Sequence, residues 1–243
     1  MNEFEIINNY NMSDNISTLI DNDADTDIYI INLKHRQDRI QNILTQFQNI
    51  KCVNIKVFNA IKYNPPFLGC SLSHLCLINY AKTNNMPFII IVEDDIELYV
   101  DDKELSSILN KLKNFKNVDM FNGSPSFWDV INNTNFLTKK YYDEDFSVVN
   151  WGQWTTFIVY FQRCFDKMLT KYTSKFSIDG FNALYNSQLV YNKKYMCCQI
   201  TNHSDIDNTT IDYHAYFEKC EKIFKSLPII FLSIYTTPHQ RFP

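Results

Sequence analysis

The sequence predicts an α/β fold in which one domain is built on a mostly parallel central sheet flanked by helices. Between residues 27 and 92, short apolar segments alternate with amphipathic ones in the order strand, helix, strand, helix, strand. That order is typical of parallel strands joined by helical crossovers. The 243 residues contain no internal repeat and no linker of biased composition. A chain of this length suits one large domain.

The first strand and helix follow directly from the spacing of apolar residues. Residues 27–33 read as a buried strand. Four apolar side chains then recur at the spacing of one helix face: Ile40, Ile43, Leu44 and Phe47. Residues 53–57 alternate as a second strand. We expect these segments to form the first β-α-β unit.

A second helix and a third strand complete the alternating strand-helix-strand-helix-strand segment. The helix is predicted over residues 71–84, beginning just after Gly69, with Ser71 as its N-cap. Residues 88–92 contain no polar side chain, which is typical of a parallel strand covered on both faces. The rest of the chain predicts helices over 104–115, 161–172, 180–190 and 213–226, and strands over 118–121, 146–161 and 195–200.

The first 26 residues are polar and acidic, with carboxylates in alternation toward their end. We interpret residues 1–26 as a solvated N-terminal segment and residues 27–243 as the folded domain. The alternative for the alternating carboxylates is a cation site.

Bulk composition narrows the class of protein. The net charge is −4 without a basic cluster, so no nucleic-acid partner is expected. Seven cysteines, no C-x-x-C pair and no signal-peptide pattern favour a reduced, cytoplasmic protein. The longest apolar run, 227–235, is too short for a transmembrane segment. Few glycines and many Asn, Ile and Lys indicate an AT-rich genome, of a parasite, a symbiont or a large DNA virus; for a virus the compartment would be the host cytoplasm.

Three consecutive carboxylates, Glu93, Asp94 and Asp95, follow the apolar strand. Ligands of open parallel sheets bind at the carboxyl ends of the strands. In an extended chain residues 93 and 95 point to one side, so Glu93 and Asp95 could hold one Mn²⁺ or Mg²⁺ ion, the hard cations that carboxylates bind together with phosphates. The alternative is a solvated turn with helix-capping acids.

Two further motifs precede this turn in the sequence. Asn32 and Leu33 end the first strand, and Arg36 and Arg39 lie three apart at the start of the next helix. Their guanidinium groups could pair with phosphates or with the three carboxylates, or form an ordinary exposed helix start. The second motif is the run Gly-Cys-Ser-Leu-Ser-His over residues 69–74. A helix N-terminus there would favour an anion; the alternative for its histidine is a structural hydrogen bond.

These motifs, in this order, resemble glycosyltransferase family 25, which contains bacterial lipooligosaccharide galactosyltransferases and collagen galactosyltransferases. The family shows N/S-L-x-x-R-x-x-R after a strand, then G-C-x-L-S-H, then an apolar strand ending in E-D-D. The corresponding residues here are 32–39, 69–74 and 93–95. Weaker similarities continue, so the likeness spans about residues 27–206.

The resemblance implies a GT-A-like fold, a nucleotide-sugar donor and Mn²⁺ or Mg²⁺. Under it, the metal ligands would be Glu93, Asp95 and, by analogy with a late histidine of GT-A enzymes, His203. The donor would be bound by Asn32, Leu33, Arg36, Arg39, Ser71, His74 and Asp94.

Transfer of a sugar also needs a base for the acceptor hydroxyl. The first candidate is Asp179, which precedes Gly180 at a predicted helix start, and the second is Asp205. The alternative role for Asp179 is a plain N-cap.

The sequence therefore predicts a hexosyltransferase. It would move galactose or glucose from a UDP-sugar to a hydroxyl of a glycan or glycosylated protein. An inactive nucleotide-sugar or glycan binding module on the same fold is the alternative, and a homo-oligomer is left open. A nucleotidyltransferase fits less well, because residues 32–36 lack the glycine-rich loop such enzymes use.

Overall fold

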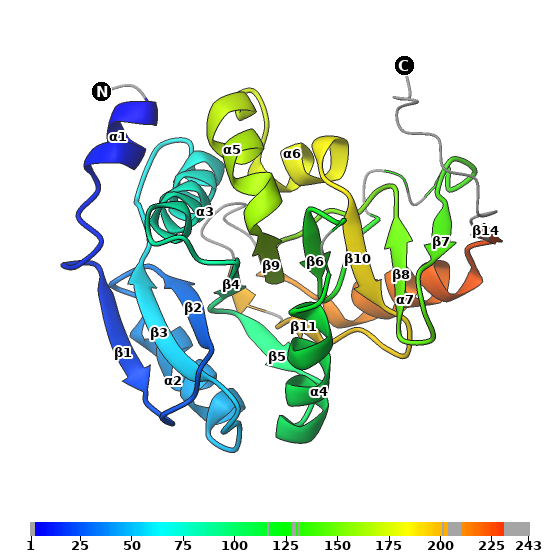
Figure 1. Cartoon of the computed structure of the whole chain (residues 1–243), viewed down its shortest axis with the longest axis horizontal. Helices are drawn as coiled ribbons and strands as arrows, with labels where there is room; N and C mark the ends of the chain where they lie inside the picture. Colours follow the sequence, from blue (N-terminus) through cyan, green and yellow to red (C-terminus); the bar gives the residue numbers. More distant parts are fainter. Residues whose placement is uncertain are drawn as a thin grey trace.

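The computed structural model describes residues 3–115, 117–127, 130, 132–200, 202–203 and 210–230. Within these residues, a ten-stranded sheet runs through the molecule with helices on both faces (Figure 1). The strand order is β1-β3-β2-β4-β9-β6-β10-β8-β7-β14. The expected α/β class with a large, helix-flanked central sheet is therefore confirmed.

The elements of the first half are α1 (Glu3–Asn9), β1 (Ile16–Ile20), β2 (Asp27–Asn32), α2 (Gln37–Phe47), β3 (Asn54–Asn59), α3 (Pro66–Thr83), β4 (Phe88–Glu93), β5 (Ile96–Leu98) and α4 (Asp102–Leu112). Those of the second half are β6 (Met120–Asn122), β7 (Lys139–Tyr141), β8 (Phe146–Val149), β9 (Phe157–Phe161), α5 (Gln162–Lys171), α6 (Ile178–Tyr185), β10 (Gln188–Tyr191), β11 (Cys197–Gln199), β12 (Asn202–His203), β13 (Thr210–Ile211), α7 (His214–Ser226) and β14 (Ile229–Ile230).

The parallel block β3-β2-β4 places the site. β2 pairs in parallel with β3 on one side and with β4 on the other. In this register Asn32 lies opposite Asn59, and Ile31 lies opposite Glu93. The three strands therefore end at the same edge of the sheet, where ligands of open α/β sheets bind.

The other half of the sheet is mixed. β9 lies between β4 and β6 and is antiparallel to both, whereas β10 is parallel to β6 and antiparallel to β8. β4 is buried on both faces, as its apolar sequence predicts, but it has one parallel and one antiparallel neighbour. The sequence pattern typical of a parallel sheet, alternating strands and helices, was confined to residues 27–92. The strands of that part, β2, β3 and β4, are the ones that pair with one another in parallel only.

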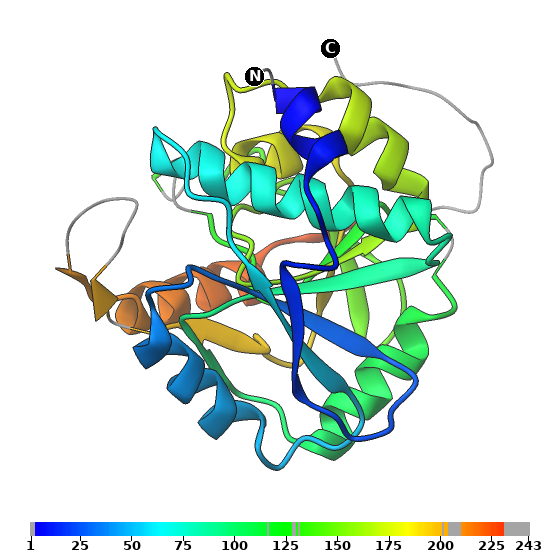
Figure 2. The same cartoon turned by 90° about the vertical axis from the view of Figure 1, so that its left-hand side faces the viewer.

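Side chains of the central strands alternate between two cores. Ile28 and Ile30 of β2 join the core formed with α2 and α4. Tyr29 and Ile31 of the same strand join the core formed with α3, α5 and α6. Figure 2 shows the corresponding arrangement, with α1, α3 and α5 on one side of the strands and α2 and α4 on the other. Period-two alternation with both faces apolar explains why β2 and β4 have almost no polar residues.

The N-terminal residues differ from the solvated segment that we expected. β1 pairs antiparallel with β3 and forms one edge of the sheet. Ile7 of α1 is buried in the core on the α3 side. The apolar side chains of this otherwise polar segment pack against the domain and hold the segment on its surface. That residues 27–243 form a separate domain stays a prediction.

The helix bounds also correct two expectations. α3 begins at Pro66, five residues before the predicted start, with Pro65 at the N-cap, and proline is well tolerated in the first turn of a helix. Gly69 is thus inside the helix rather than before it. α6 ends at Tyr185, and the apolar residues that follow form β10, because a short apolar run fits a strand as well as a helix.

Gly69 has a packing reason to lack a side chain. A Cβ at this position would lie 2.4 Å from the carbonyl oxygen of Ile61. The loop after β3 can therefore pass close to α3 only over glycine. At Gly180 an added Cβ would meet only the Ser177 hydroxyl at 3.5 Å, so packing does not require glycine there.

Candidate active site

Asp94 is the best-anchored carboxylate of the acidic turn. Its Oδ2 accepts a 2.6 Å hydrogen bond from Asn32 Nδ2, and its Oδ1 accepts a 2.7 Å hydrogen bond from Arg39 Nη1. Both partners were predicted in this region from the motif after the first strand. Burial and the charge of Asp95 raise the pKa of Asp94 to about 6, against the opposing effect of Arg39. The turn after β4 is thus tied to the end of β2 and the start of α2.

Asp95 has one oxygen bound and one free. Its Oδ2 lies 3.2 Å from Arg39 Nη1 and accepts a 3.0 Å hydrogen bond from Gln199 Nε2 of β11. Its Oδ1 is buried and has no hydrogen-bond partner among the described residues. A buried carboxylate oxygen without a partner is costly. A cation at this position would remove that cost, so the residues present fit a hard divalent metal.

Glu93 points to a different set of partners. Thr155 Oγ1 lies 2.6 Å from Glu93 Oε1 and 3.0 Å from Asp179 Oδ1. One hydroxyl has one proton, so it can donate to only one of the two carboxylates at a time. Burial, together with the charges of Asp95 and Asp179, raises the pKa of Glu93 to about 8. The structure thus brings Asp179, our first candidate base, next to the acidic turn.

The turn geometry corrects the extended-chain argument. Residues 94 and 95 form a turn rather than a continuation of β4. Asp94 and Asp95, not Glu93 and Asp95, share one cation, the guanidinium of Arg39. The charges of all three carboxylates still act on one another. The pKa values of Glu93 and Asp94 are both raised, and neighbouring carboxylates with shifted pKa values beside a cavity are characteristic of functional sites.

Two cavities meet at these carboxylates. The first has a volume of about 360 Å³ and lies over the ends of β2, β3 and β4. Its wall includes Leu33, Arg39, Lys62 and the three acids. The second, of about 260 Å³, lies toward α6 and is lined by residues that include Trp154, Thr155, Asp179 and Tyr213. Cys70, Glu93 and Gln199 line both cavities.

The two arginines of the first motif have different surroundings. Arg39 is buried and holds Asp94 and Asp95. Arg36 forms an ion pair of 2.8 Å with the exposed Asp38, and its carbonyl oxygen accepts a hydrogen bond from Asn32. Of our two expectations for these guanidinium groups, pairing with the acidic turn therefore holds for Arg39. A phosphate contact of Arg36 stays a prediction.

Ser71 and His74 make contacts within the fold. Ser71 is fully buried in α3; its hydroxyl donates to the carbonyl of Phe67 and accepts from the backbone N–H of Ile178. It is therefore not an N-cap; it connects α3 to α6. His74 is also fully buried, and burial lowers its pKa to about 3. Neither residue lines the two cavities, so their roles in donor binding stay predictions.

The last two predicted residues fall at the margin of the described chain. His203 lies in β12, which pairs with β13, and the position of its side chain is outside the described part. Asp205 is outside the described residues altogether. The predicted roles of both stay predictions.

Several wall residues were missed by sequence reasoning. Lys62 and Tyr63 follow β3 and reach the first cavity because β3 ends beside β2. Tyr213, just before α7, reaches the second cavity from far along the chain. The sequence did contain a signal for Lys62, because it follows a parallel strand and ligands bind at the carboxyl ends of such strands. No local pattern marks Tyr213.

The comparison with protein families confirms the resemblance. Residues 66–177 match the model of glycosyltransferase family 25, described as an LPS biosynthesis protein. The matched part, referred to below as the family 25 segment, covers less than half of the chain. The family 25 segment contains α3, the acidic turn and Thr155 and stops two residues before Asp179. The match supports glycosyltransferase activity, which implies a sugar donor and a glycan acceptor.

No curated protein matches the chain. Among solved structures, the crystal structure titled "A197 from STIV" aligns at 8% identity with a TM-score of 0.42, covering 76% of this chain and 92% of that one. Within the described residues, no helix combines the length and the hydropathy needed to cross a membrane.

Proposed function

We propose that the protein transfers a hexose, galactose or glucose, from a UDP-sugar to a hydroxyl of a glycan or glycosylated protein. The observation that carries this proposal is the acidic turn of the family 25 segment, which lies between two adjoining cavities and leaves Asp95 Oδ1 without a partner among the residues that the structure describes. Glycosyl transfer needs two bound substrates that meet at one charged centre, and this arrangement supplies both positions.

The first cavity suits the donor. Its walls combine apolar strand-end residues, such as Ile31 and Leu33, with the cationic side chain of Lys62. Its volume of about 360 Å³ lies within the ~300–1,000 Å³ range of ligand sites. An apolar wall can hold a base and a ribose face, and the amine can approach a diphosphate. The nucleoside would therefore lie over the ends of β2 and β3.

A divalent cation, Mn²⁺ or Mg²⁺, fits the acidic turn. Asp95 would offer its free oxygen, with Glu93 and His203 as the further ligands proposed. Such a cation, when bound, neutralises the charge of the leaving diphosphate. Arg39 holds both Asp94 and Asp95 in place through Nη1, and Asn32 fixes the remaining oxygen of Asp94. These residues position the turn before any donor arrives.

The second cavity suits the acceptor. Trp154 and Tyr213 give it aromatic walls, and Asp179 places a carboxylate in it. Aromatic faces pack well against sugar rings. Asp179, hydrogen-bonded by Thr155, would accept the proton of the acceptor hydroxyl. Asp205 remains the second candidate for this role.

The experiment is a transfer and hydrolysis assay of the full chain with a panel of UDP-, GDP- and CMP-sugars, with Mn²⁺ and with chelator. The expected result is release of UDP from UDP-galactose or UDP-glucose that chelator abolishes. Calorimetric binding of UDP without turnover of any sugar would instead favour an inactive binding module. Turnover unaffected by chelator would contradict the role of the cation.

A further inference from the structure

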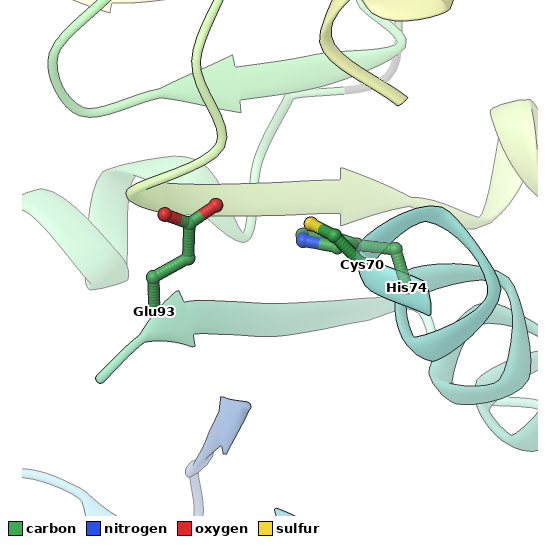
Figure 3. Close-up of side chains that lie close together, drawn as sticks. All are labelled: Cys70, His74 and Glu93. Atoms are coloured by element: carbon green, nitrogen blue, oxygen red, sulfur yellow. The ribbon is translucent and has the colours of Figure 1, made fainter. Parts of the chain in front are cut away.

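A second group of potential ligand atoms lies beside the acidic turn. It consists of the thiol of Cys70, the imidazole of His74 and the carboxylate of Glu93 (Figure 3). Cys70 and His74 are one turn apart on α3, so both project from the same face of the helix. Glu93 ends β4, the strand against which α3 packs. One sulfur, one nitrogen and one oxygen atom all lie within 4.8 Å of one another.

His74 has a nitrogen to offer. The side chain is fully buried, and Nδ1 lies 3.4 Å from the hydroxyl of Tyr160. Nε2 is buried and has no hydrogen-bond partner among the described residues. Figure 3 shows the imidazole and the Cys70 sulfur together at the end of α3 that faces Glu93. An unpaired buried nitrogen is costly, and ligation of a metal is one way to satisfy it.

The donor set determines which cation would fit. Thiolate, imidazole and carboxylate are the usual zinc ligands, at about 2.0–2.3 Å from the metal. Tetrahedral ligands at that radius lie about 3.5 Å apart, so small side-chain movements from the present spacing are enough. Hard cations such as Mn²⁺ and Mg²⁺ prefer oxygen ligands and do not select a thiol.

We propose that Cys70, His74 and Glu93 bind a Zn²⁺ ion, at a position distinct from the hard cation of Asp95. Glu93 would then serve the zinc ion, and the hard cation would keep Asp95 and His203 as its proposed ligands. Three protein ligands leave a fourth position open, as in zinc sites that bind water or substrate. Cys70 and Glu93 line both cavities, so the open position faces the space where the two substrates would meet. The proposal needs only the geometry of α3 and β4 and does not depend on glycosyl transfer.

A similar trio elsewhere provides a control. Glu97, Cys198 and His214 also offer ligand atoms within 4.8 Å. There the two ring nitrogens face different partners: Nδ1 lies 3.5 Å from Cys198 Sγ and Nε2 lies 3.6 Å from Glu97 Oε2. The Tyr99 hydroxyl is 2.8 Å from the same sulfur. This trio is already paired internally and leaves no ring nitrogen free.

The first test uses the unmodified chain. Cys70 and Cys52 are both partly exposed thiols, whereas the other five cysteines are buried. Alkylation by iodoacetamide, followed by peptide mass spectrometry, is measured with and without Zn²⁺ in excess Mg²⁺. We expect zinc to slow alkylation of Cys70 at least tenfold and to leave Cys52 unchanged. Equal alkylation of Cys70 in both conditions would overturn the proposal.

The second test identifies the ligands. Co²⁺ bound to a thiolate gives a near-ultraviolet charge-transfer band, which carboxylates alone do not produce. The band should appear in the wild type, Cys198→Ser and Asp95→Asn and be lost in Cys70→Ser. His74→Gln should weaken cobalt binding at least tenfold. A band lost in Cys198→Ser but kept in Cys70→Ser would refute the assignment.

Retention of the band in Asp95→Asn separates this site from the proposed donor cation, so either proposal can fail without the other. The alkylation test decides if Cys70→Ser does not fold.

Discussion

Arg39 Nη1 and Asp94 Oδ1 lie 2.7 Å apart, and their side chains are only 10% and 7% exposed. The pair joins the first turn of α2 to the turn after β4, across 55 residues of sequence. Because the turn carries two further carboxylates, removing its buried cation would leave several charges without compensation.

Replacing Arg39 with Met should destabilise the protein by about 3–5 kcal/mol, the usual cost of removing one partner of a buried ion pair. Urea unfolding at pH 7 measures this. Arg36→Met is the matched control, because its partner Asp38 is 60% exposed and exposed pairs contribute about 0–1 kcal/mol. Equal losses in the two variants would show that the acidic turn does not need Arg39.

Asp95→Asn should abolish sugar transfer and leave the fold intact. The substitution keeps the size of the side chain and its position beside Gln199, but removes the charge that would hold the cation. Turnover of UDP-sugar with Mn²⁺ and the thermal midpoint should be measured together. Near-normal turnover would remove Asp95 from the proposed metal site.

Asp179→Asn should lower turnover about 10²–10⁴-fold, the range expected for loss of a general base, with donor affinity little changed. Asp166→Asn, at a side chain that is 78% exposed on α5, is the control and should behave as wild type. An unchanged rate in Asp179→Asn would move the base role to another residue, with Asp205 first in order.

Gly69→Ala and Gly180→Ala should differ sharply. At Gly69 the new Cβ would lie 2.4 Å from the carbonyl oxygen of Ile61, so we expect a loss of about 1–3 kcal/mol from overpacking. At Gly180 the nearest atom is 3.5 Å away within a helix, where alanine is favoured over glycine by up to about 1 kcal/mol. Denaturant unfolding of both variants tests this. Equal stability of the two would contradict the close approach over Gly69.

We expect Asp119 to stabilise the folded protein at neutral pH and to lose this effect in acid. Burial alone would raise its pKa, but Lys167 and the N–H of Ser187 outweigh burial and hold the pKa below its usual 3.8. A lowered pKa in the folded state stabilises the protein above pH 3.8, and this contribution is lost as the pH falls through the folded-state pKa.

Asp119→Asn should therefore cost about 1–3 kcal/mol at pH 7, with a smaller difference from wild type at the lowest pH that permits folding. The measurement is the free energy of unfolding in urea from pH 7 downward. A difference that stays constant across this range would show that the charge of Asp119 is not what stabilises the fold.

Much of the first half of the fold could be predicted because its signals are local. Apolar periodicity located β2, α2, β3 and β4 to within a few residues, and two parallel pairings then required their ends to meet. The same reasoning anticipated that Asn32 and Arg39 would lie near the acidic turn. The start of α3 was misplaced because the glycine that suggested a helix start serves packing against the β3 loop instead.

The sequence by itself determined the α/β class, the order of motifs and their likeness to family 25, since all three depend on residues close together in the chain. Only the tertiary structure decided that β9 enters antiparallel, that Thr155 joins Glu93 to Asp179, and that Cys70 and His74 face Glu93. Contacts between distant segments depend on how whole elements pack, and no local pattern encodes that packing. The four glycines show the same division: their scarcity was visible in the composition, but only packing distinguished Gly69 from Gly180.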